Sequence, residues 1–106
     1  MKRAHKYGAK SCLIDGIRFD SQAEGRRFSQ LKLLLRAGTI EDLVLQPRFP
    51  FVVNGIKVCT YVADFGYREA DESVVEDVKG VKTDVYRIKR ALMKAIYGIE
   101  IREIGA

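Results

Sequence analysis

Two short stretches rich in β-branched and aromatic residues constrain the fold of this chain most: YVADFGYR at 61–68 and VVEDVKG at 74–80. Such composition is typical of β-strands, and the short acidic link between the two stretches predicts a tight turn. We therefore expect an antiparallel hairpin. With the acidic link as its turn, Gly66 pairs with Val75.

The same register brings two acidic side chains together. Asp64 pairs with Asp77, and Lys79 lies on the same face as Asp77 because side chains alternate along a strand. Paired residues have Cβ atoms roughly 4.5–5.5 Å apart, and like charges directly opposite each other destabilise a sheet. A cation is therefore expected to offset the repulsion. A bound metal ion and the Lys79 ammonium are the two candidates.

Turn, capping and periodicity signals predict the other elements. Asp-Gly at 15–16 and Asn-Gly at 54–55 are typical of hairpin turns, and glycines at 38 and 98 are typical of helix ends. The predicted elements are a hairpin over 11–19, a helix from Asp20 or Ser21 to about Ala37, a strand around 43–46, a hairpin of 49–53 and 56–61, a helix from Thr83 or Asp84 to Tyr97, and a strand over 99–104. Strand 56–61 is expected to continue into the strand of Asp64.

This order of elements predicts an α+β domain. A strand, a helix and a further strand imply one parallel pairing with a right-handed crossover. The expected architecture is a mixed β-sheet flanked by two helices in α-β-β-β-α-β order, preceded by an N-terminal β-hairpin. Apolar residues at helical spacing predict the buried side of each helix. They are Phe28, Leu31, Leu34 and Leu35 in the first helix and Val85, Ile88, Leu92 and Ile96 in the second.

Size and charge narrow the classes of function. A length of 106 residues suits one domain at 11–106, preceded by a basic arm at 1–10. The formal net charge of +5 favours a polyanionic partner, with DNA as the candidate. Acids at the centre of the chain favour a metal site that acts on phosphate over a simple DNA-coating protein.

The chain offers little material for other kinds of site. Its single histidine, His5, argues against histidine-based triads and zinc sites, and we expect no organic cofactor. Cys12 and Cys59 lack metal-type spacing and are expected to be packed strand residues without a disulfide. No apolar run approaches the roughly 18 residues of a membrane span, and no signal-peptide core follows the basic arm. A cytoplasmic protein without a membrane partner is expected.

Glu24 is a third acid with two interpretations. It lies four residues before Phe28 and seven before Leu31, so it belongs to the apolar face of the first helix. It also completes a Ser-x-x-Glu capping box with Ser21, in which its carboxylate only reaches back to the helix start. Together with Asp64 and Asp77, an inward-facing acid favours the metal interpretation.

Glu24, Asp64 and the run Asp77-Val78-Lys79 resemble the PD-(D/E)xK nucleases, the restriction-endonuclease-like superfamily, over nearly the whole chain. Short phage and prophage nucleases are similar in their short sequence motifs. They in turn resemble phage junction-resolving endonuclease I and the endonuclease subunit of Tn7-type transposases. The similar segments are FDSQAE at 19–24, LQP at 45–47, YVADF at 61–65 and VEDVKG at 75–80. The chain departs from the pattern at Ala63, where the nominal residue is proline, and at Asp77, where many members have glutamate.

The resemblance implies a restriction-endonuclease-like core and a divalent-metal-dependent DNA endonuclease that leaves 5′-phosphate and 3′-hydroxyl ends. It implies Mg²⁺, for which Mn²⁺ can substitute, held by Asp64, Asp77 and the Val78 carbonyl, with Glu24 binding through water or at a second metal. Lys79 would orient the attacking water and stabilise developing charge, and its role as the base stays open. The alternative for Lys79 is a plain salt bridge with one of the acids.

DNA-phosphate contacts are expected from the basic residues Lys82, Arg87 and Arg90, although a charged helix face is often only solvated. The resemblance alone adds Gln46 and Arg48. One active site per chain cuts one strand, so double-strand or junction cleavage requires a homodimer. The N-terminal hairpin is the expected interface.

Two other functions stay open. The chain can be a non-catalytic nucleic-acid-binding domain with this fold, or a subunit of a transposition or packaging complex. The native DNA substrate (junction, flap, duplex end or single strand) and any sequence preference leave no recognisable pattern in a chain this short.

Overall fold

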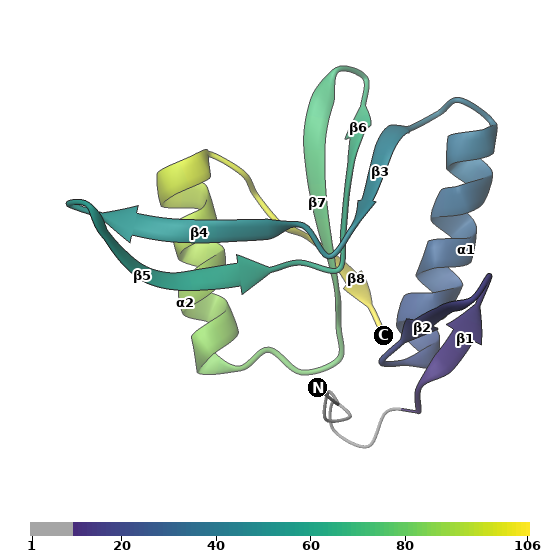
Figure 1. The fold of residues 1–106 in the computed structure, drawn as a ribbon, viewed down its shortest axis with the longest axis horizontal. Coiled ribbons are helices and arrows are strands. Elements are labelled where there is room, and N and C mark those ends of the chain that lie inside the picture. The colour runs from purple at the N-terminus through teal and green to yellow at the C-terminus, as the bar shows by residue number, and fades with distance from the viewer. Residues whose placement is uncertain (1–9) are drawn as a thin grey trace.

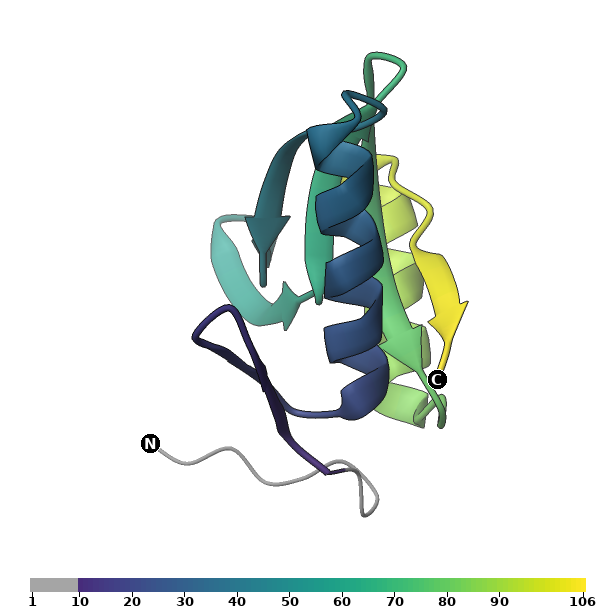
Figure 2. The ribbon, with the colours of Figure 1, turned by 90° about the vertical axis from the view of Figure 1, so that its right-hand side faces the viewer.

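The computed structural model describes residues 10–106 and contains a mixed four-stranded sheet with a helix on each face (Figures 1 and 2). The strands are β1 (Cys12–Ile14), β2 (Ile17–Phe19), β3 (Glu41–Leu45), β4 (Arg48–Val53), β5 (Ile56–Val62), β6 (Phe65–Glu69), β7 (Glu72–Lys79) and β8 (Arg102–Gly105). The helices are α1 (Gln22–Arg36) and α2 (Asp84–Leu92), and α2 runs on into a π-helical turn, η1 (Met93–Tyr97). The predicted α+β class is confirmed. Of the predicted basic arm, residues 1–9 lie outside the described residues.

The four-stranded sheet has the strand order β3-β6-β7-β8. β6 and β7 form the predicted hairpin, in which Gly66 pairs with Val75 and the last pair before the site is Phe65 with Glu76. β3 is antiparallel to β6, whereas β8 is parallel to β7, which confirms the expected parallel pairing. Asp64 and Asp77 each lie one position beyond the last pair of the β6–β7 ladder.

The prediction that strand 56–61 continues into the strand of Asp64 is wrong, because β5 and β6 are separate strands. β4 and β5 form a separate two-stranded sheet that projects from the main one, so five strands rather than three lie between the helices (Figure 1). The chain leaves the main sheet at Gln46–Pro47 and returns at Ala63–Asp64, and these two segments lie side by side. The Gln46 N–H donates to the Asp64 carbonyl at 3.0 Å, and the Ala63 N–H donates to the Pro47 carbonyl at 3.1 Å. In the main sheet alone, the succession is α1, β3, β6, β7, α2, β8.

α1 covers one face of the sheet through Phe28 and Leu31, which pack against Phe65 and Tyr67 of β6. Its start is defined by Ser21, whose hydroxyl accepts a hydrogen bond from the Glu24 N–H at 3.1 Å. Leu35, predicted to be buried, is 40% exposed because the sheet-facing side of the last turn is already filled by Leu34. The N-terminal hairpin β1–β2 packs beside this helix, and both of its turn residues, Asp15 and Gly16, have positive φ.

α2 and the β4–β5 hairpin cover the other face. Thr83 caps α2 as expected, accepting from the Tyr86 N–H at 3.1 Å, and Gly98 ends η1 in the left-handed conformation. The predicted buried side of α2 is wrong, because Val85 and Ile88 are 61% and 60% exposed. Tyr86 and Met93, seven residues apart on a neighbouring side of the helix, face the sheet instead. Ile96 is also exposed, and only Leu92 of the predicted set packs on this core.

The two cysteines are free and half-buried, one in each layer of packing, as expected. Cys12 packs on the α1 side of the sheet, and Cys59 packs on the α2 side. Over residues 10–106 no helix is both long enough and apolar enough to cross a bilayer.

Candidate active site

The predicted site residues come from elements that meet at one end of the main sheet. α1 begins there, β6 begins there, and β7 ends there, at the lower end in Figure 1. Glu24 is in the first turn of α1, Asp64 immediately precedes β6, and Asp77 and Lys79 end β7. Three acids and one lysine that span 56 positions of the chain are thus carried to the same end of the fold.

Asp64 occupies the corner where the chain re-enters the main sheet. It is 7% exposed, and its Oδ2 accepts a hydrogen bond from the Val78 N–H at 2.8 Å. Its own N–H donates to the Glu76 carbonyl at 3.2 Å. The Asp64 carboxylate therefore binds the β7 backbone just beyond the last residue pair of the β6–β7 ladder. This contact holds it beside Asp77.

Asp77 is 2% exposed and accepts a hydrogen bond from the Tyr61 hydroxyl. Lys79 Nζ lies 3.4 Å from Asp77 Oδ2. Burial, then the hydrogen bond and the negative charge of Asp64, raise the pKa of Asp77 to about 7, while Tyr61 and Lys79 act in the opposite direction. The single ammonium thus does not fully offset two buried carboxylates. The two carboxylates offer negative charge and oxygen ligands, and divalent cations such as Mg²⁺ bind to ligands of this kind.

Tyr61 and Tyr86 are site residues that the sequence analysis missed. Burial and the charge of Asp77 raise the pKa of Tyr61, so its hydroxyl stays protonated and donates to Asp77. Lys79 Nζ lies 4.2 Å from the centre of the Tyr86 ring. The only signal available was the position of Tyr61, three residues before Asp64. Nothing local points to Tyr86, which reaches Lys79 from α2.

Glu24 is 4% exposed, so its predicted inward orientation is confirmed. The helix that carries it packs on the face of Phe65 and Tyr67, whereas Asp77 shares the opposite face with Val75, which packs beneath α2. A contact between Glu24 and Asp77 therefore has to pass around the end of the sheet. The Ser21–Glu24 backbone contact of the capping box is present as well. The role of Glu24 at a metal remains a prediction.

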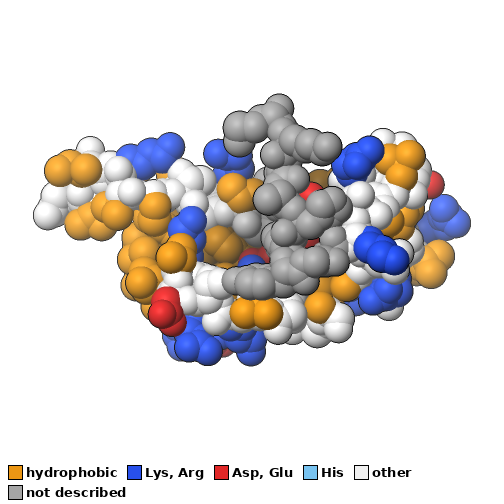
Figure 3. Space-filling view, turned by 90° about the horizontal axis from the view of Figure 1, so that it is seen from below, with side chains coloured by type: hydrophobic (Ala, Val, Ile, Leu, Met, Phe, Trp, Pro, Cys, Tyr) orange, Lys and Arg blue, Asp and Glu red, His pale blue; other side chains and the backbone are white. Residues whose placement is uncertain are grey.

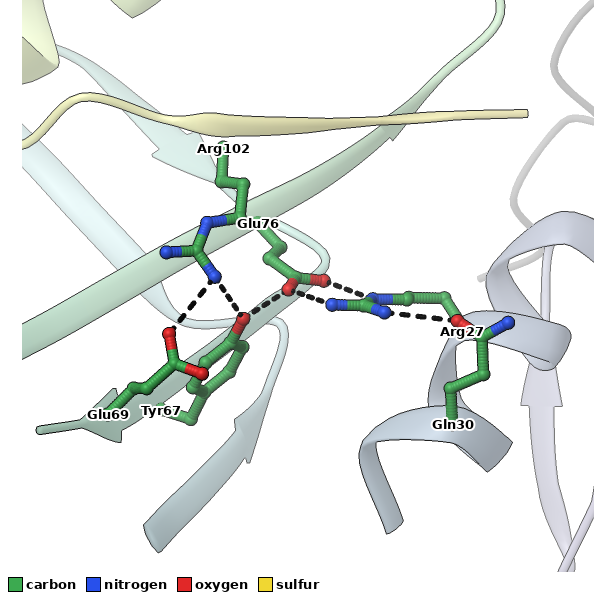
Figure 4. A network of polar contacts seen from close by, with 6 residues as sticks. All are labelled: Arg27, Gln30, Tyr67, Glu69, Glu76 and Arg102. Atoms are coloured by element: carbon green, nitrogen blue, oxygen red, sulfur yellow. Dashed lines mark hydrogen bonds and ion pairs between the residues drawn. The ribbon is translucent and has the colours of Figure 1, made fainter. Parts of the chain in front are cut away.

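Glu76, the neighbour of Asp77, points to the α1 face and is completely buried (Figure 4). Arg27 of α1 binds it with two hydrogen bonds, Nε to Oε1 at 2.8 Å and Nη2 to Oε2 at 2.6 Å. The Tyr67 hydroxyl also donates to Glu76, and Arg102 of β8 donates to that hydroxyl at 3.1 Å. This network joins α1 to the strand of Asp77 one residue before the site. Glu76 therefore faces α1, on the side of the strand opposite to Asp77.

The predicted DNA-contacting residues Lys82, Arg87 and Arg90 all have acidic partners in the structure. Lys82 and Arg90 both pair with Glu103 of β8, at 3.1 and 2.8 Å, and Arg87 lies 3.9 Å from Asp84. Figure 3 views the molecule from the end where the site lies: Lys and Arg side chains lie at several places around the face, and small areas of acidic side chain are visible nearer its middle.

Gln46 and Arg48 flank the corner beside Asp64, and both are exposed. Gln46 has a φ of 51° and reaches Asp64 through its backbone. The predicted ligand Val78 contacts Asp64 through its N–H. Among the residues from 10 onward, no group of three or more His, Cys, Asp or Glu side chains has a spacing suited to a metal ion. The structure brings two of the predicted acids, Asp64 and Asp77, into contact.

The sequence profile of a family described as "Protein of unknown function (DUF1064)" matches residues 4–103. The chain belongs to the DUF1064 family. A comparison with curated proteins finds no significant match. The DUF1064 profile spans every site residue, from Glu24 through Lys79, and also Tyr86 and Glu103.

Proposed function

We propose that this DUF1064 protein is a divalent-metal-dependent DNA endonuclease that leaves 5′-phosphate and 3′-hydroxyl ends. The observation that carries the proposal is the contact of two buried carboxylates, Asp64 and Asp77, with Lys79 Nζ 3.4 Å from Asp77. The resemblance to PD-(D/E)xK nucleases assigns the same three residues to one site. The succession of helices and strands around the main sheet is compatible with that resemblance.

Each residue has a defined task in this proposal. Asp64 and Asp77 would hold Mg²⁺, or Mn²⁺ in its place, with the Val78 carbonyl as a further ligand and Glu24 acting through water or at a second metal. The bound cation would supply charge neutralisation at the scissile phosphate and a more acidic water. Lys79 would orient the attacking water and stabilise negative charge as it develops on the phosphate. Tyr61 keeps the Asp77 carboxylate in one orientation through its hydrogen bond.

The proposed partner is DNA, and the proposed location is the cytoplasm of a bacterial host cell. Lys82, Arg87 and Arg90 would contact phosphates, and Gln46 and Arg48 would lie beside the site. A homodimer would bring two sites to the two strands of a duplex or of a four-way junction. The β1–β2 hairpin is one candidate interface, with Leu13 67% exposed at its surface.

The test is cleavage by the purified full-length protein of supercoiled, linear and four-way-junction DNA with Mg²⁺, Mn²⁺ or EDTA. Asp64→Asn and Asp77→Asn are expected to abolish cutting, and Lys79→Met to slow it by about 100-fold or more. Glu100→Gln is the matched control, because this acid is exposed and pairs only with Lys94 among the described ion pairs. Cutting that persists in both aspartate variants would remove the site assignment.

A second candidate function is non-catalytic nucleic-acid binding. It is favoured by the formal net charge of +5, which attracts a polyanion without any need for catalysis. In that case DNA binding would persist in EDTA, no cleavage would appear with any cation, and Asp77→Asn would leave the affinity unchanged.

A further inference from the structure

We infer that Tyr86 is a positioning residue: its ring holds the Lys79 ammonium near the Asp77 carboxylate but keeps the two from closing to a short hydrogen bond. This inference rests on the proposed nuclease function. Lys79 Nζ lies 4.2 Å from the Tyr86 ring centre and 3.4 Å from Asp77 Oδ2. A cation over the face of an aromatic ring is attracted by the negative charge of that face. The ammonium therefore lies between two attractions, one ionic and one aromatic.

The distance between Lys79 Nζ and Asp77 Oδ2 reflects the competition between these two attractions. A charge-assisted N–H···O bond between ammonium and carboxylate closes to about 2.7–2.9 Å when nothing opposes it. At 3.4 Å the Lys79–Asp77 pair is longer, and the ring is the other group that attracts the ammonium. An ammonium held in this way keeps its charge near the site. It also leaves oxygen lone pairs of Asp77 available to a metal ion.

Tyr86 is itself held firmly. It is 5% exposed, and its hydroxyl donates to Glu103 Oε2 at 2.7 Å. Glu103 is oriented by Arg90 at 2.8 Å and by Lys82 at 3.1 Å. These contacts keep the pKa of Glu103 low, at about 2, so that it stays an anion. A phenol that donates to an anion is polarised toward a more negative ring, which strengthens its attraction for Lys79.

Lys82 and Arg90 thereby acquire a second role. Both were expected to contact DNA, but their described contacts are with Glu103, at the far end of the chain of contacts that leads through Tyr86 to Lys79. The Arg90 guanidinium is also near the Tyr86 ring, with its central carbon 5.8 Å from the ring centre. This is farther than Lys79, so the nearer cation over the ring is the lysine.

The experiment compares Tyr86→Phe, which keeps the ring, with Tyr86→Leu, which removes it. With Mg²⁺ and plasmid DNA, Tyr86→Leu is expected to lower kcat about tenfold with little change in KM, and Tyr86→Phe to lower kcat only about threefold. In a Lys79→Met background, Tyr86→Leu is expected to have no further effect. Tyr97→Leu is the matched control, since its ring contacts Phe49 and Phe51 and its hydroxyl contacts Pro50. Equal losses in the Phe and Leu variants, or a further loss in the Lys79→Met background, would overturn the inference.

A second readout needs no catalysis and no folded Leu variant. In the metal-free wild-type protein, the ring should shift the NMR signals of the Lys79 ε-methylene protons upfield, and Tyr86→Phe should retain that shift. Ordinary lysine positions for these signals would overturn the contact even if the protein cuts DNA. A clear upfield shift in a protein that cuts no DNA would instead support the contact and count against the nuclease proposal.

Discussion

At the level of single residues, Asp77 couples the site to pH. Its pKa is raised to about 7 in the folded protein from an ordinary value of 3.8, chiefly by burial and then by Asp64. Between these values the folded protein binds more protons than the unfolded chain. By linkage, the free energy of unfolding falls as pH rises through this window, and it levels off only about one pH unit above the folded pKa of Asp77. Glu103, with a pKa lowered to about 2, acts in a separate acid window below about 4.5.

In metal-free buffer, the melting temperature of the wild type should fall between pH 5 and pH 8 relative to that of Asp77→Asn. Asparagine keeps an oxygen for the Tyr61 hydroxyl but carries no charge, so its variant lacks this pH dependence. Differential scanning calorimetry of both proteins at several pH values is the measurement. Parallel curves for the two proteins would show that Asp77 is ionised at an ordinary pH.

At the level of elements, a buried ion pair joins α1 to β7. Glu76 is fully buried, the Arg27 side chain is 18% exposed, and their bidentate contact lies one residue before Asp77 and one helical turn after Glu24 (Figure 4). The same pair therefore determines how the helix of Glu24 stands relative to the strand of Asp77. Removing one partner of a buried pair leaves an uncompensated charge.

Arg27→Met should therefore lower the free energy of unfolding by about 3–5 kcal/mol. The double variant Arg27→Met with Glu76→Met should recover most of that loss, because no charge is left buried without a partner. Urea unfolding followed by circular dichroism measures both. A double variant as unstable as Arg27→Met would mean that shape, rather than charge, dominates this contact.

The two sides of α2 are expected to contribute unequally to stability. Met93 is fully buried, whereas Ile88 is 60% exposed. Met93→Ala should cost about 2–5 kcal/mol of stability, because it opens a cavity in the core. Ile88→Ala should cost within about 0.5 kcal/mol, as is usual for surface positions. The same urea titration distinguishes them, and a large loss for Ile88→Ala would show that this apolar side is covered in solution.

Across the whole protein, the formal net charge of +5 favours association with a polyanion such as DNA. Arg36 ends α1, at the opposite end of the helix from Glu24. Arg87 is the fourth residue of α2, and this helix begins at the lower end of the fold in Figure 1, where the site lies. Phosphate contacts release counterions, so each one steepens the fall of affinity with salt.

Arg87→Gln should consequently reduce the slope of log affinity against log salt concentration by about one, whereas Arg36→Gln should leave it unchanged. Fluorescence anisotropy with a labelled duplex in Ca²⁺ or EDTA, at several salt concentrations, measures both slopes. Equal slopes for the two variants would remove Arg87 from the DNA-binding surface.

Several local features could be predicted from short-range rules. Asp-Gly at 15–16, Asn-Gly at 54–55, the caps Ser21 and Thr83 and the left-handed Gly98 all act within a few residues of chain, where sterics and one hydrogen bond decide the outcome. The register of β6 and β7 follows from their turn in the same way. The juxtaposition of Asp64 with Asp77 is therefore a property of sequence.

Other features depend on contacts between distant segments. Whether 56–62 joins the main sheet, which side of α2 is buried, and where Glu76 finds its partner were settled by packing, because several arrangements satisfy the same local pattern. Valine and isoleucine at helical spacing predict an apolar side of α2, but the side chains that fill the core are Tyr86 and Met93.

Two aspartates and a lysine near one another along a hairpin were readable from the order of the amino acids. The aromatic ring beneath that lysine, and the arginine that ties the first helix to the same strand, were not. Both arrive from elements remote in sequence, and only the closing of the core brings them within reach.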